Sequence, residues 1–222
     1  MARVLITGAG RGIGLEFVRQ YAADAWEVIA TVREGAAATE LEGLGARVEQ
    51  LDMRDFAALA SFGERLGGAP LDLFIANAGV SGPQRISNPQ LAGEWQDVHA
   101  VNAVAPTLLA EALLPNILAA EGRMVAITSR MGSISDSSGG SIAYRASKAA
   151  LNAAWRALAL DLAGRPVTIA LFHPGWVQTD MGGPNAPLAL VDSVAGMRRT
   201  IAGLTPGDSG RFLDYRGDTL PW

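Results

Sequence analysis

The chain has 222 residues, a formal net charge of −4 and no cysteine. This length suits one domain with a full hydrophobic core, so we expect a single domain over residues 1–222. The mild acidity and the lack of basic runs argue against nucleic acid or a membrane surface as a partner. Disulfides and thiol catalysis are excluded. The two histidines, His99 and His173, are too few and too scattered to bind zinc, and we expect no metal.

The start of the chain runs directly into an apolar, strand-like pattern at residues 3–7. This pattern leaves no room for a signal peptide, and no apolar run approaches the ~20 residues that span a bilayer. We therefore expect a cytoplasmic protein. The absence of cysteine leaves the redox compartment open.

Short apolar runs alternate with longer helical patterns along the whole sequence. Strands are expected at residues 4–7, 27–32, 46–51, 71–76, 123–128, 167–172 and 211–214. Helices are expected at residues 13–23, 55–66, 94–119, 143–163 and 191–202. Near-continuous apolar strands separated by helices indicate a parallel sheet that is covered on both faces. We therefore predict a single doubly wound (Rossmann-type) α/β domain, with a seven-stranded parallel sheet and helices on both faces.

A glycine-rich segment, TGAGRGIG at residues 7–14, joins the first expected strand to the first expected helix. Glycines permit a tight turn and let the backbone approach a pyrophosphate at the helix N-terminus. The common GxGxxG pattern does not fit, because Ile13 occupies its third glycine position. The phosphate-binding loop of nucleoside triphosphatases does not fit either, because no Gly-Lys-Ser/Thr follows. The spacing that fits is TGxxxGxG.

Tyr144 and Lys148 are four residues apart in an expected helix and therefore share one face. A lysine ammonium there can favour the phenolate and lower a tyrosine pKa that is ordinarily about 10. Lys148 is also the only lysine in the chain. On spacing alone, an exposed surface pair is the simpler interpretation. The accompanying motifs favour the catalytic one.

With both motifs, the chain resembles the short-chain dehydrogenase/reductase family, in its short single-domain branch, over essentially its whole length. Its C-terminal part, with residues 174–183, 212–215 and 221–222, looks like the sniffer and C-factor carbonyl-reductase-like group. The chain departs from the family pattern at Ala76, where an asparagine is common. The further matches, in chain order, are Asp52, Asn77-Ala78-Gly79, Asn102, Ser129 and the segment from Pro174 to Thr179.

The resemblance implies an oxidoreductase with four catalytic residues. Tyr144 would exchange a proton with the substrate oxygen while a hydride passes between the nicotinamide and the carbonyl carbon. Lys148 would lower the tyrosine pKa and hold the nicotinamide ribose. Ser129 would bind the same substrate oxygen. Asn102 would hold a water that connects Lys148 to solvent.

Other serines precede Tyr144 and could compete with Ser129 for its role. Loop serines are usually turn formers. Ser129 is preferred because it ends a strand and begins the Ser-x-x-Gly pattern of the family. The competing residues are Ser133, Ser135, Ser137, Ser138 and Ser141.

The cofactor preference depends on the charge after the second strand. That strand ends in Arg33, where an acid would bind the ribose of NAD and an arginine would accept the 2′-phosphate of NADP. Arg11 could reach the same phosphate, although both arginines could simply be solvated. We therefore expect NADP(H) to be preferred over NAD(H). Asp52 would flank the adenine, or it could instead cap the following helix. The residues assigned to the cofactor are Gly8, Gly10, Arg11, Gly12, Ile13, Gly14, Arg33, Asp52, Met53, Asn77, Ala78, Gly79, Tyr144, Lys148, Pro174, Gly175, Val177 and Thr179.

The segment 180–190 is short and rich in glycine and proline, which suggests an open pocket for a small carbonyl or alcohol substrate. Plausible pocket walls are Met131, Ile134, Trp176 and Met181. The helix around residues 149–162 is apolar on nearly every face, and with the family resemblance it suggests a homodimer, with a tetramer possible.

Three functions are compatible with these features. The leading one is an NADPH-dependent carbonyl reductase or alcohol dehydrogenase. The second is a cofactor-binding regulatory or signalling protein with little turnover. The third is a nucleotide-sugar epimerase or dehydratase, which the loop spacing and the short chain disfavour.

Overall fold

Seven parallel strands form one sheet in the order β3-β2-β1-β4-β5-β6-β7. The structure is a computed structural model that describes residues 1–33, 35, 38–85 and 87–222. The strands are β1 (Arg3–Ile6), β2 (Glu27–Val32), β3 (Arg47–Gln50), β4 (Leu73–Ala76), β5 (Arg123–Ile127), β6 (Thr168–His173) and β7 (Arg211–Asp214). The predicted sheet is confirmed, and its strand order reverses between β1 and β4. Ligands bind at such a switch point in doubly wound folds.

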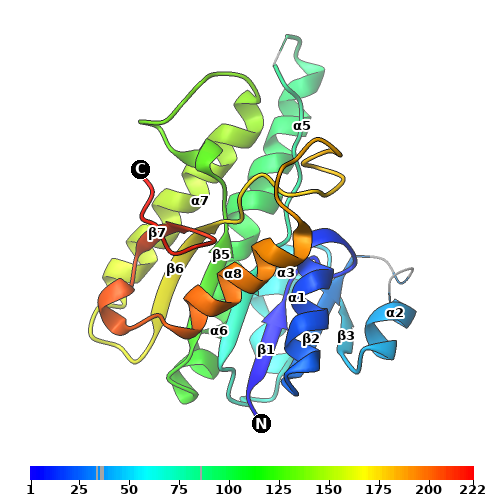
Figure 1. Cartoon of the computed structure of the whole chain (residues 1–222), viewed down its shortest axis with the longest axis vertical. Coiled ribbons are helices and arrows are strands. Elements are labelled where there is room, and N and C mark those ends of the chain that lie inside the picture. The colour runs from blue at the N-terminus through cyan, green and yellow to red at the C-terminus, as the bar shows by residue number, and fades with distance from the viewer. Residues whose placement is uncertain (34, 36–37, 86) are drawn as a thin grey trace.

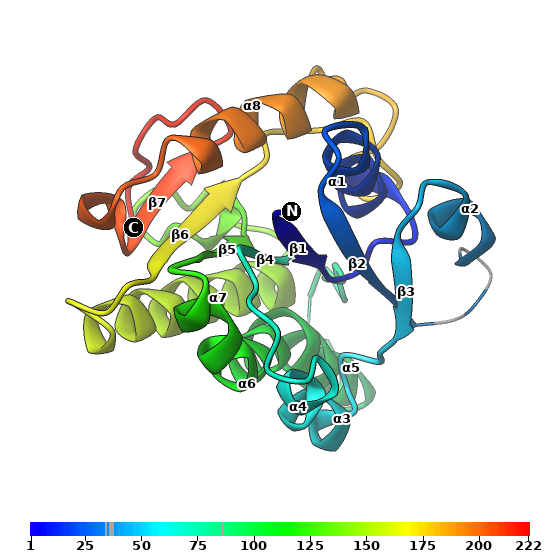
Figure 2. The ribbon, with the colours of Figure 1, turned by 90° about the horizontal axis from the view of Figure 1, so that it is seen from below.

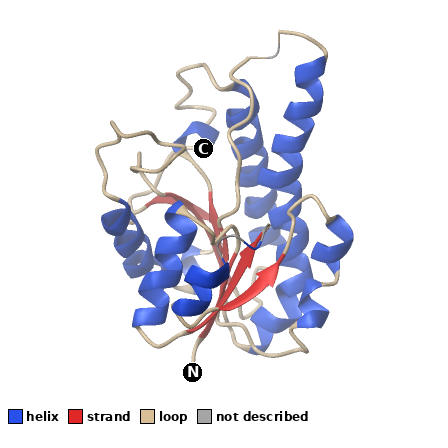
Figure 3. Ribbon diagram, turned by 90° about the vertical axis from the view of Figure 1, so that its right-hand side faces the viewer, coloured by secondary structure: helices blue, strands red, loops and turns tan. Residues whose placement is uncertain are grey.

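Helices cover both faces of this sheet, as predicted (Figure 2). One face carries α1 (Gly12–Ala23), α2 (Ala38–Gly43) and α8 (Leu190–Ala202). The other carries α3 (Phe56–Ala60), α4 (Phe62–Arg65), α5 (Gln90–His99), α6 (Ala105–Ala119) and α7 (Ile142–Asp161). Figure 3 shows the sheet between these layers, with loops gathered beyond the strand ends, away from the N-terminus.

Two hydrophobic clusters hold the layers together. Consecutive strand residues alternate between them: Leu5 belongs to one cluster, and Val4 and Ile6 belong to the other. The central strands are therefore buried on both faces, which explains their near-continuous apolar sequences. The edge strand β3 is polar and only partly buried. The bulkiest fully buried side chain, Trp155 of α7, packs 6.1 Å from the ring of Phe74 in β4.

The helix expected at residues 55–66 is two short helices. The Ser61 hydroxyl donates hydrogen bonds to the carbonyls of Ala57 and Ala58, at 3.1 and 3.4 Å, and α4 begins after this residue. Serine side chains compete with the helix in this way. The cap of α3 is Asp55, whose carboxylate accepts from the Ala58 amide at 3.0 Å. The alternative of Asp52 as the helix cap is therefore wrong.

The long helix expected at residues 94–119 begins earlier, at Gln90, and contains a π-helical turn, η2 (Ala100–Val104), between α5 and α6. By length and composition this 30-residue helix could cross a bilayer, contrary to expectation. Half of its apolar window is nevertheless buried inside the fold. Core helices of soluble proteins share these properties.

Candidate active site

The predicted site residues lie beyond one end of the sheet, where the strands reach their carboxyl ends. The glycine-rich turn follows β1, and further candidates follow β4, β5 and β6 directly. Figure 1 shows the loops after β5 and β6 on the same side of the sheet as the upper end of α5. Residues that are far apart in the sequence therefore meet at this end of the sheet.

Helix α7 carries both Tyr144 and Lys148. The Lys148 side chain is buried, and its Nζ donates a 2.8 Å hydrogen bond to the carbonyl of Ile127, the last residue of β5. The same nitrogen lies 5.8 Å from the centre of the Tyr144 ring. The structure thus brings together the two residues that the sequence pairs, and it anchors the lysine to the sheet.

The protonation of this pair is governed by burial. Burial lowers the pKa of Lys148 from 10.5 to about 8. Burial also raises the pKa of Tyr144 above 10.0, and a hydrogen bond with the Ser129 side chain opposes that rise. The expected lowering of the Tyr144 pKa by Lys148 is therefore not observed: desolvation dominates, and the opposing contribution comes from Ser129.

Ser129 follows β5 and is buried next to Tyr144. Its Oγ accepts a 3.1 Å hydrogen bond from the Met131 amide and so caps the N-terminus of the 3₁₀ turn η3 (Arg130–Gly132). Four of the competing serines instead bind within loops. Ser133 binds the Asp136 amide, Ser135 the Trp222 carbonyl, Ser138 the Arg145 side chain and Ser141 the Gln84 side chain.

Asn102 lies in the π-helical turn and is fully buried. Its Oδ1 accepts from the Val80 amide at 2.8 Å, and its Nδ2 donates to the Val80 carbonyl at 2.8 Å and to Ser147 Oγ at 2.9 Å. Asn102 thus ties the loop after β4 to the helix that carries Tyr144 and Lys148. Its water-holding role stays a prediction. π-helical turns frequently occur at functional sites.

The glycine-rich turn is held by the residues that directly follow β4. Thr7 Oγ1 accepts hydrogen bonds from the amides of Asn77 and Ala78, at 3.0 and 3.2 Å. Asn77 Nδ2 donates to the carbonyls of Thr7 and Gly8, at 2.9 and 3.1 Å. The Asn77 amide group therefore supports the turn itself. This role was not predicted from the sequence, which assigned Asn77 to the cofactor.

Glycine is required at two positions of the turn. A Cβ on Gly14 would lie 2.4 Å from the Gly8 carbonyl oxygen, and Gly8 has a φ of +64° with a Cβ position 2.8 Å from Ala78 Cα. Within the described part of the chain, no side chain caps the N-terminus of α1. Its amide groups remain available for an anion such as a pyrophosphate. The turn therefore fits a dinucleotide.

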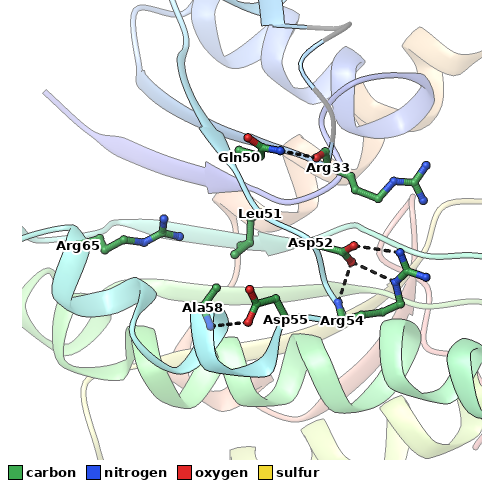
Figure 4. Close-up of a pocket in the computed structure, with 8 residues that line it drawn as sticks. All are labelled: Arg33, Gln50, Leu51, Asp52, Arg54, Asp55, Ala58 and Arg65. Atoms are coloured by element: carbon green, nitrogen blue, oxygen red, sulfur yellow. Dashed lines mark hydrogen bonds and ion pairs between the residues drawn. The ribbon is translucent and has the colours of Figure 1, made fainter.

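A cavity of about 860 Å³ lies beyond the carboxyl ends of β2 and β3 (Figure 4). Arg33 and Arg54 extend toward one end of this cavity and Arg65 lies at the other. The Asp52 carboxylate accepts from the Arg54 backbone amide at 2.9 Å and from its Nη2 at 3.0 Å, which lowers the Asp52 pKa. Sequence reasoning missed Arg54, although it follows Asp52 by two residues. Met53 is buried.

Arg11 pairs with an acidic side chain from a distant segment, and its expected contact with the cofactor phosphate stays a prediction. Its guanidinium forms an ion pair with Asp180, in the segment after β6, and both side chains are largely exposed. Gly12 lies beside Thr179, because a Cβ there would be 3.7 Å from Thr179 Cγ2. These contacts bring the segment after β6 onto the glycine-rich turn. Among the described residues, Arg11 is engaged away from the cavity that Arg33 lines.

The segment after β6 is a compact loop. Ser193 of α8 donates a buried 2.6 Å hydrogen bond to the Pro174 carbonyl. Gly175 has a φ of +89°, and a Cβ there would lie 2.5 Å from Leu188 Cδ2. Val177 forms an isolated bridge with Leu188. Thr179 Oγ1 accepts from the Gly182 amide at 3.0 Å. The loop thus presents its predicted cofactor residues in a fixed conformation.

A doubly wound sheet with a glycine-rich turn after β1 and a Tyr-Lys pair beyond its carboxyl end is typical of Rossmann-type oxidoreductases. The family profile described as short chain dehydrogenase matches residues 2–187. The chain therefore belongs to the short-chain dehydrogenase/reductase family.

Relatives of known name agree with this assignment. C-signal of Myxococcus xanthus is 45% identical over 166 residues, which are 74% of this chain and 100% of that protein. The carbonyl reductase Sniffer of D. melanogaster has a TM-score of 0.92 and 32% identity over 100% of both chains. The NADPH-bound carbonyl reductase from chicken fatty liver has a TM-score of 0.87 and 34% identity over 100% of this chain and 99% of that one. The predicted resemblance to the sniffer and C-factor group is confirmed.

Proposed function

We propose that the protein is an NADPH-dependent carbonyl reductase that converts a small carbonyl compound to an alcohol, or catalyses the reverse reaction. The observation that carries this proposal is the cluster of Ser129, Tyr144 and Lys148 at the carboxyl end of the sheet, with the lysine buried and anchored to β5. A chain that only bound a cofactor would gain nothing from burying its single lysine beside a tyrosine, since burying a charge is costly.

Each residue has a role that its position supports. Tyr144 supplies the proton for the substrate oxygen. Ser129, whose side chain hydrogen-bonds with Tyr144, donates to the same substrate oxygen and stabilises the charge that develops there. Lys148, held by the Ile127 carbonyl, is placed to bind the nicotinamide ribose. When bound, the nicotinamide supplies the hydride.

The preference for NADPH rests on the cationic end of the cavity beyond β2 and β3. Gln50 of β3 donates a 3.2 Å hydrogen bond to the Arg33 carbonyl and so fixes the end of β2. Arg54, oriented by Asp52, faces the same end. We assign the 2′-phosphate to Arg33 and Arg54, because guanidinium groups bind phosphates bidentately. The uncapped N-terminus of α1 would hold the pyrophosphate.

The rim of the site supports an apolar substrate. Val80, Ile134, Trp176 and Met181 are exposed large hydrophobic residues, and they come from the loops after β4, β5 and β6. Exposed apolar residues that surround a polar site mark a binding surface for apolar groups. We therefore expect aromatic or aliphatic ketones and aldehydes to be better substrates than charged ones.

We further propose that the protein is cytoplasmic and forms a homodimer through α6 and α7. Partly buried apolar side chains remain on both helices, and Val104, just before α6, is exposed. The residues concerned are Leu108, Leu114, Leu118, Ala150, Ala154 and Leu162. Light scattering after size-exclusion chromatography tests the dimer.

A second candidate is a cofactor-binding signalling protein with little turnover. The 45% identity to a protein named C-signal favours it. The complete set of Ser129, Tyr144, Lys148 and Asn102 favours an enzyme instead.

The deciding experiment is a titration with NADPH and NADH, followed by NADPH oxidation against a panel of aldehydes, ketones, diketones and quinones. Tyr144→Phe is the control. It should reduce turnover by about 10²-fold or more, the contribution of a general acid, while NADPH affinity stays within a few fold. Tight NADPH binding without turnover on the panel would favour the signalling function. Turnover retained by the Tyr144→Phe variant would remove Tyr144 from its role.

A further inference from the structure

The segment Ser133–Ser141, here called the β5–α7 loop, joins the turn after Ser129 to the helix that carries Tyr144. Its residues from Ile134 to Gly140 are exposed, and serine and glycine dominate its sequence. Gly139, Gly140 and Ser141 all have positive φ, at 79°, 71° and 44°. Such a sequence has a high conformational entropy when nothing holds it.

Packing contributes little to holding this loop. A hollow of about 180 Å³ lies between the loop and α7. Ala146 and Ala149 form its floor on the helix side, and neither side chain is long enough to fill it. The apolar contacts that normally fix a loop against a helix are therefore sparse here.

Arg145, which also lines the hollow, spans it with hydrogen bonds. Its Nε donates to the carbonyls of Gly139 and Gly140 at 2.9 and 3.1 Å, and its Nη2 donates to Ser138 Oγ at 2.8 Å. Its Nη1 reaches the Met131 carbonyl at 3.4 Å. One side chain thus joins the C-terminal end of the loop, and the turn that precedes the loop, to the helix turn that carries Tyr144.

We propose that Arg145 is a positioning residue that sets the substrate-facing conformation of the β5–α7 loop and thereby the fit of the substrate. Two further anchors assist it: the Ser135 amide and Oγ donate to the Trp222 carbonyl at 3.0 and 2.7 Å, and Ser141 Oγ donates to Gln84 Oε1 at 2.8 Å. The exposed Ile134 of this loop is one of the rim residues described above. The catalytic part of this proposal rests on the proposed carbonyl reductase function.

Arg145 holds the loop through its planar, forked guanidinium group. Its nitrogens point in fixed directions and reach acceptors both at the C-terminal end of the loop and in the turn before the loop, whereas a lysine ammonium is a single point of donation. Arg145→Lys should therefore restore only part of what Arg145→Ala removes. Arg156→Ala is the matched control, because Arg156 lies on the same helix and donates a 3.0 Å hydrogen bond to the Gly210 carbonyl. It is about 16 Å further along the helix axis.

The test has a structural and a kinetic measurement. Amide hydrogen exchange of peptides covering residues 131–141 should accelerate about tenfold in Arg145→Ala, less in Arg145→Lys and not at all in Arg156→Ala. With the carbonyl substrate, KM should rise about tenfold in Arg145→Ala while kcat changes less than about threefold. NADPH affinity should stay within about twofold, because Arg145 lies outside the proposed cofactor contacts.

Each of the two measurements can contradict a different part of the proposal. Unchanged exchange in both Arg145 variants overturns the positioning role, whatever the kinetics show. Faster exchange with unchanged KM overturns the link to substrate fit. A wild-type protein without turnover refutes the proposed function, and hydrogen exchange then still decides whether Arg145 holds the loop. Loss of folding in Arg145→Ala, measured as circular dichroism, leaves Arg145→Lys to decide by the same exchange measurement.

Discussion

The ammonium nitrogen of Lys148 lies 5.8 Å from the centre of the Tyr144 ring and 2.8 Å from the carbonyl oxygen of Ile127. The carbonyl at the end of β5 therefore fixes the position of the lysine. Burial and the hydrogen bond with Ser129 set the pKa of Tyr144. The serine that we propose as a donor for the substrate oxygen thus also lowers the pKa of Tyr144.

Ser129→Ala should change the pH profile of carbonyl reduction. Ser129 lowers the pKa of Tyr144, so its removal leaves burial unopposed and raises that pKa. Reduction needs the protonated tyrosine, and we expect the alkaline limb of kcat to move to higher pH. We also expect kcat to fall about 10²-fold with the loss of a donor to the oxyanion. A limb that stays in place or moves to lower pH would contradict this assignment.

Lys148 should make stability depend on pH. Because burial lowers its pKa from 10.5 to about 8, the folded state binds fewer protons than the unfolded state between these values. The free energy of unfolding should therefore rise from pH 8 to about 9.5, by up to about 2 kcal/mol. Lys148→Met should abolish the rise, as measured by urea unfolding at each pH. The interval ends below the ionisation of tyrosine, because buried Tyr21, with its pKa raised to about 12, opposes the trend at higher pH.

Arg33→Ala and Arg54→Ala should each weaken NADPH binding about tenfold or more while NADH binding changes less than about threefold. The 2′-phosphate is the group that distinguishes the two cofactors. Arg65→Ala is the matched control, since Arg65 lines the opposite end of the same cavity and stacks over the Phe62 ring. Equal losses for both cofactors, measured by fluorescence titration, would show that these arginines do not bind the phosphate.

Arg11→Ala should change the NADPH dissociation constant less than about fivefold, since an exposed ion pair contributes little. Asp180→Asn, which leaves Arg11 without this partner, should have an effect of similar size. A loss of more than about twentyfold for Arg11→Ala, specific to NADPH, would return Arg11 to the phosphate-binding role that its place in the sequence suggests.

Most of the fold could be predicted because local apolar patterns in the sequence indicate the strands and helices. The central strands are apolar on both faces, and right-handed crossovers between short segments favour a doubly wound sheet. The edge strand β3 is polar and only partly buried. Helix α2 was not predicted, because its six residues contain one buried side chain, Leu41, and so give no period. The break at Ser61 was also missed, since a serine inside a helical pattern does not reveal which carbonyls its hydroxyl will bind.

The site was predictable where its chemistry is held in short motifs, as in Tyr144 and Lys148. It was not predictable where two distant segments meet. Arg11 and Asp180 are 169 residues apart in sequence, and nothing local indicates that they form a pair. Arg54 and Arg145 were overlooked for a related reason. In a chain with seventeen arginines, residue type alone does not separate a functional guanidinium from a solvated one.

The π-helical turn at Ala100–Val104 has a consequence for insertions and deletions. Each residue of a regular helix advances the side-chain direction by about 100°, and a π turn holds one residue more than a regular turn. The helix before it is therefore out of phase with the helix after it. On α5, before this turn, Val98 packs against Gly82 near Ala143. Deleting one residue within this turn would convert it to a regular α-helical turn and leave the directions of α5 and α6 nearly unchanged, whereas the same deletion elsewhere in either helix would rotate one part against the other by about 100°.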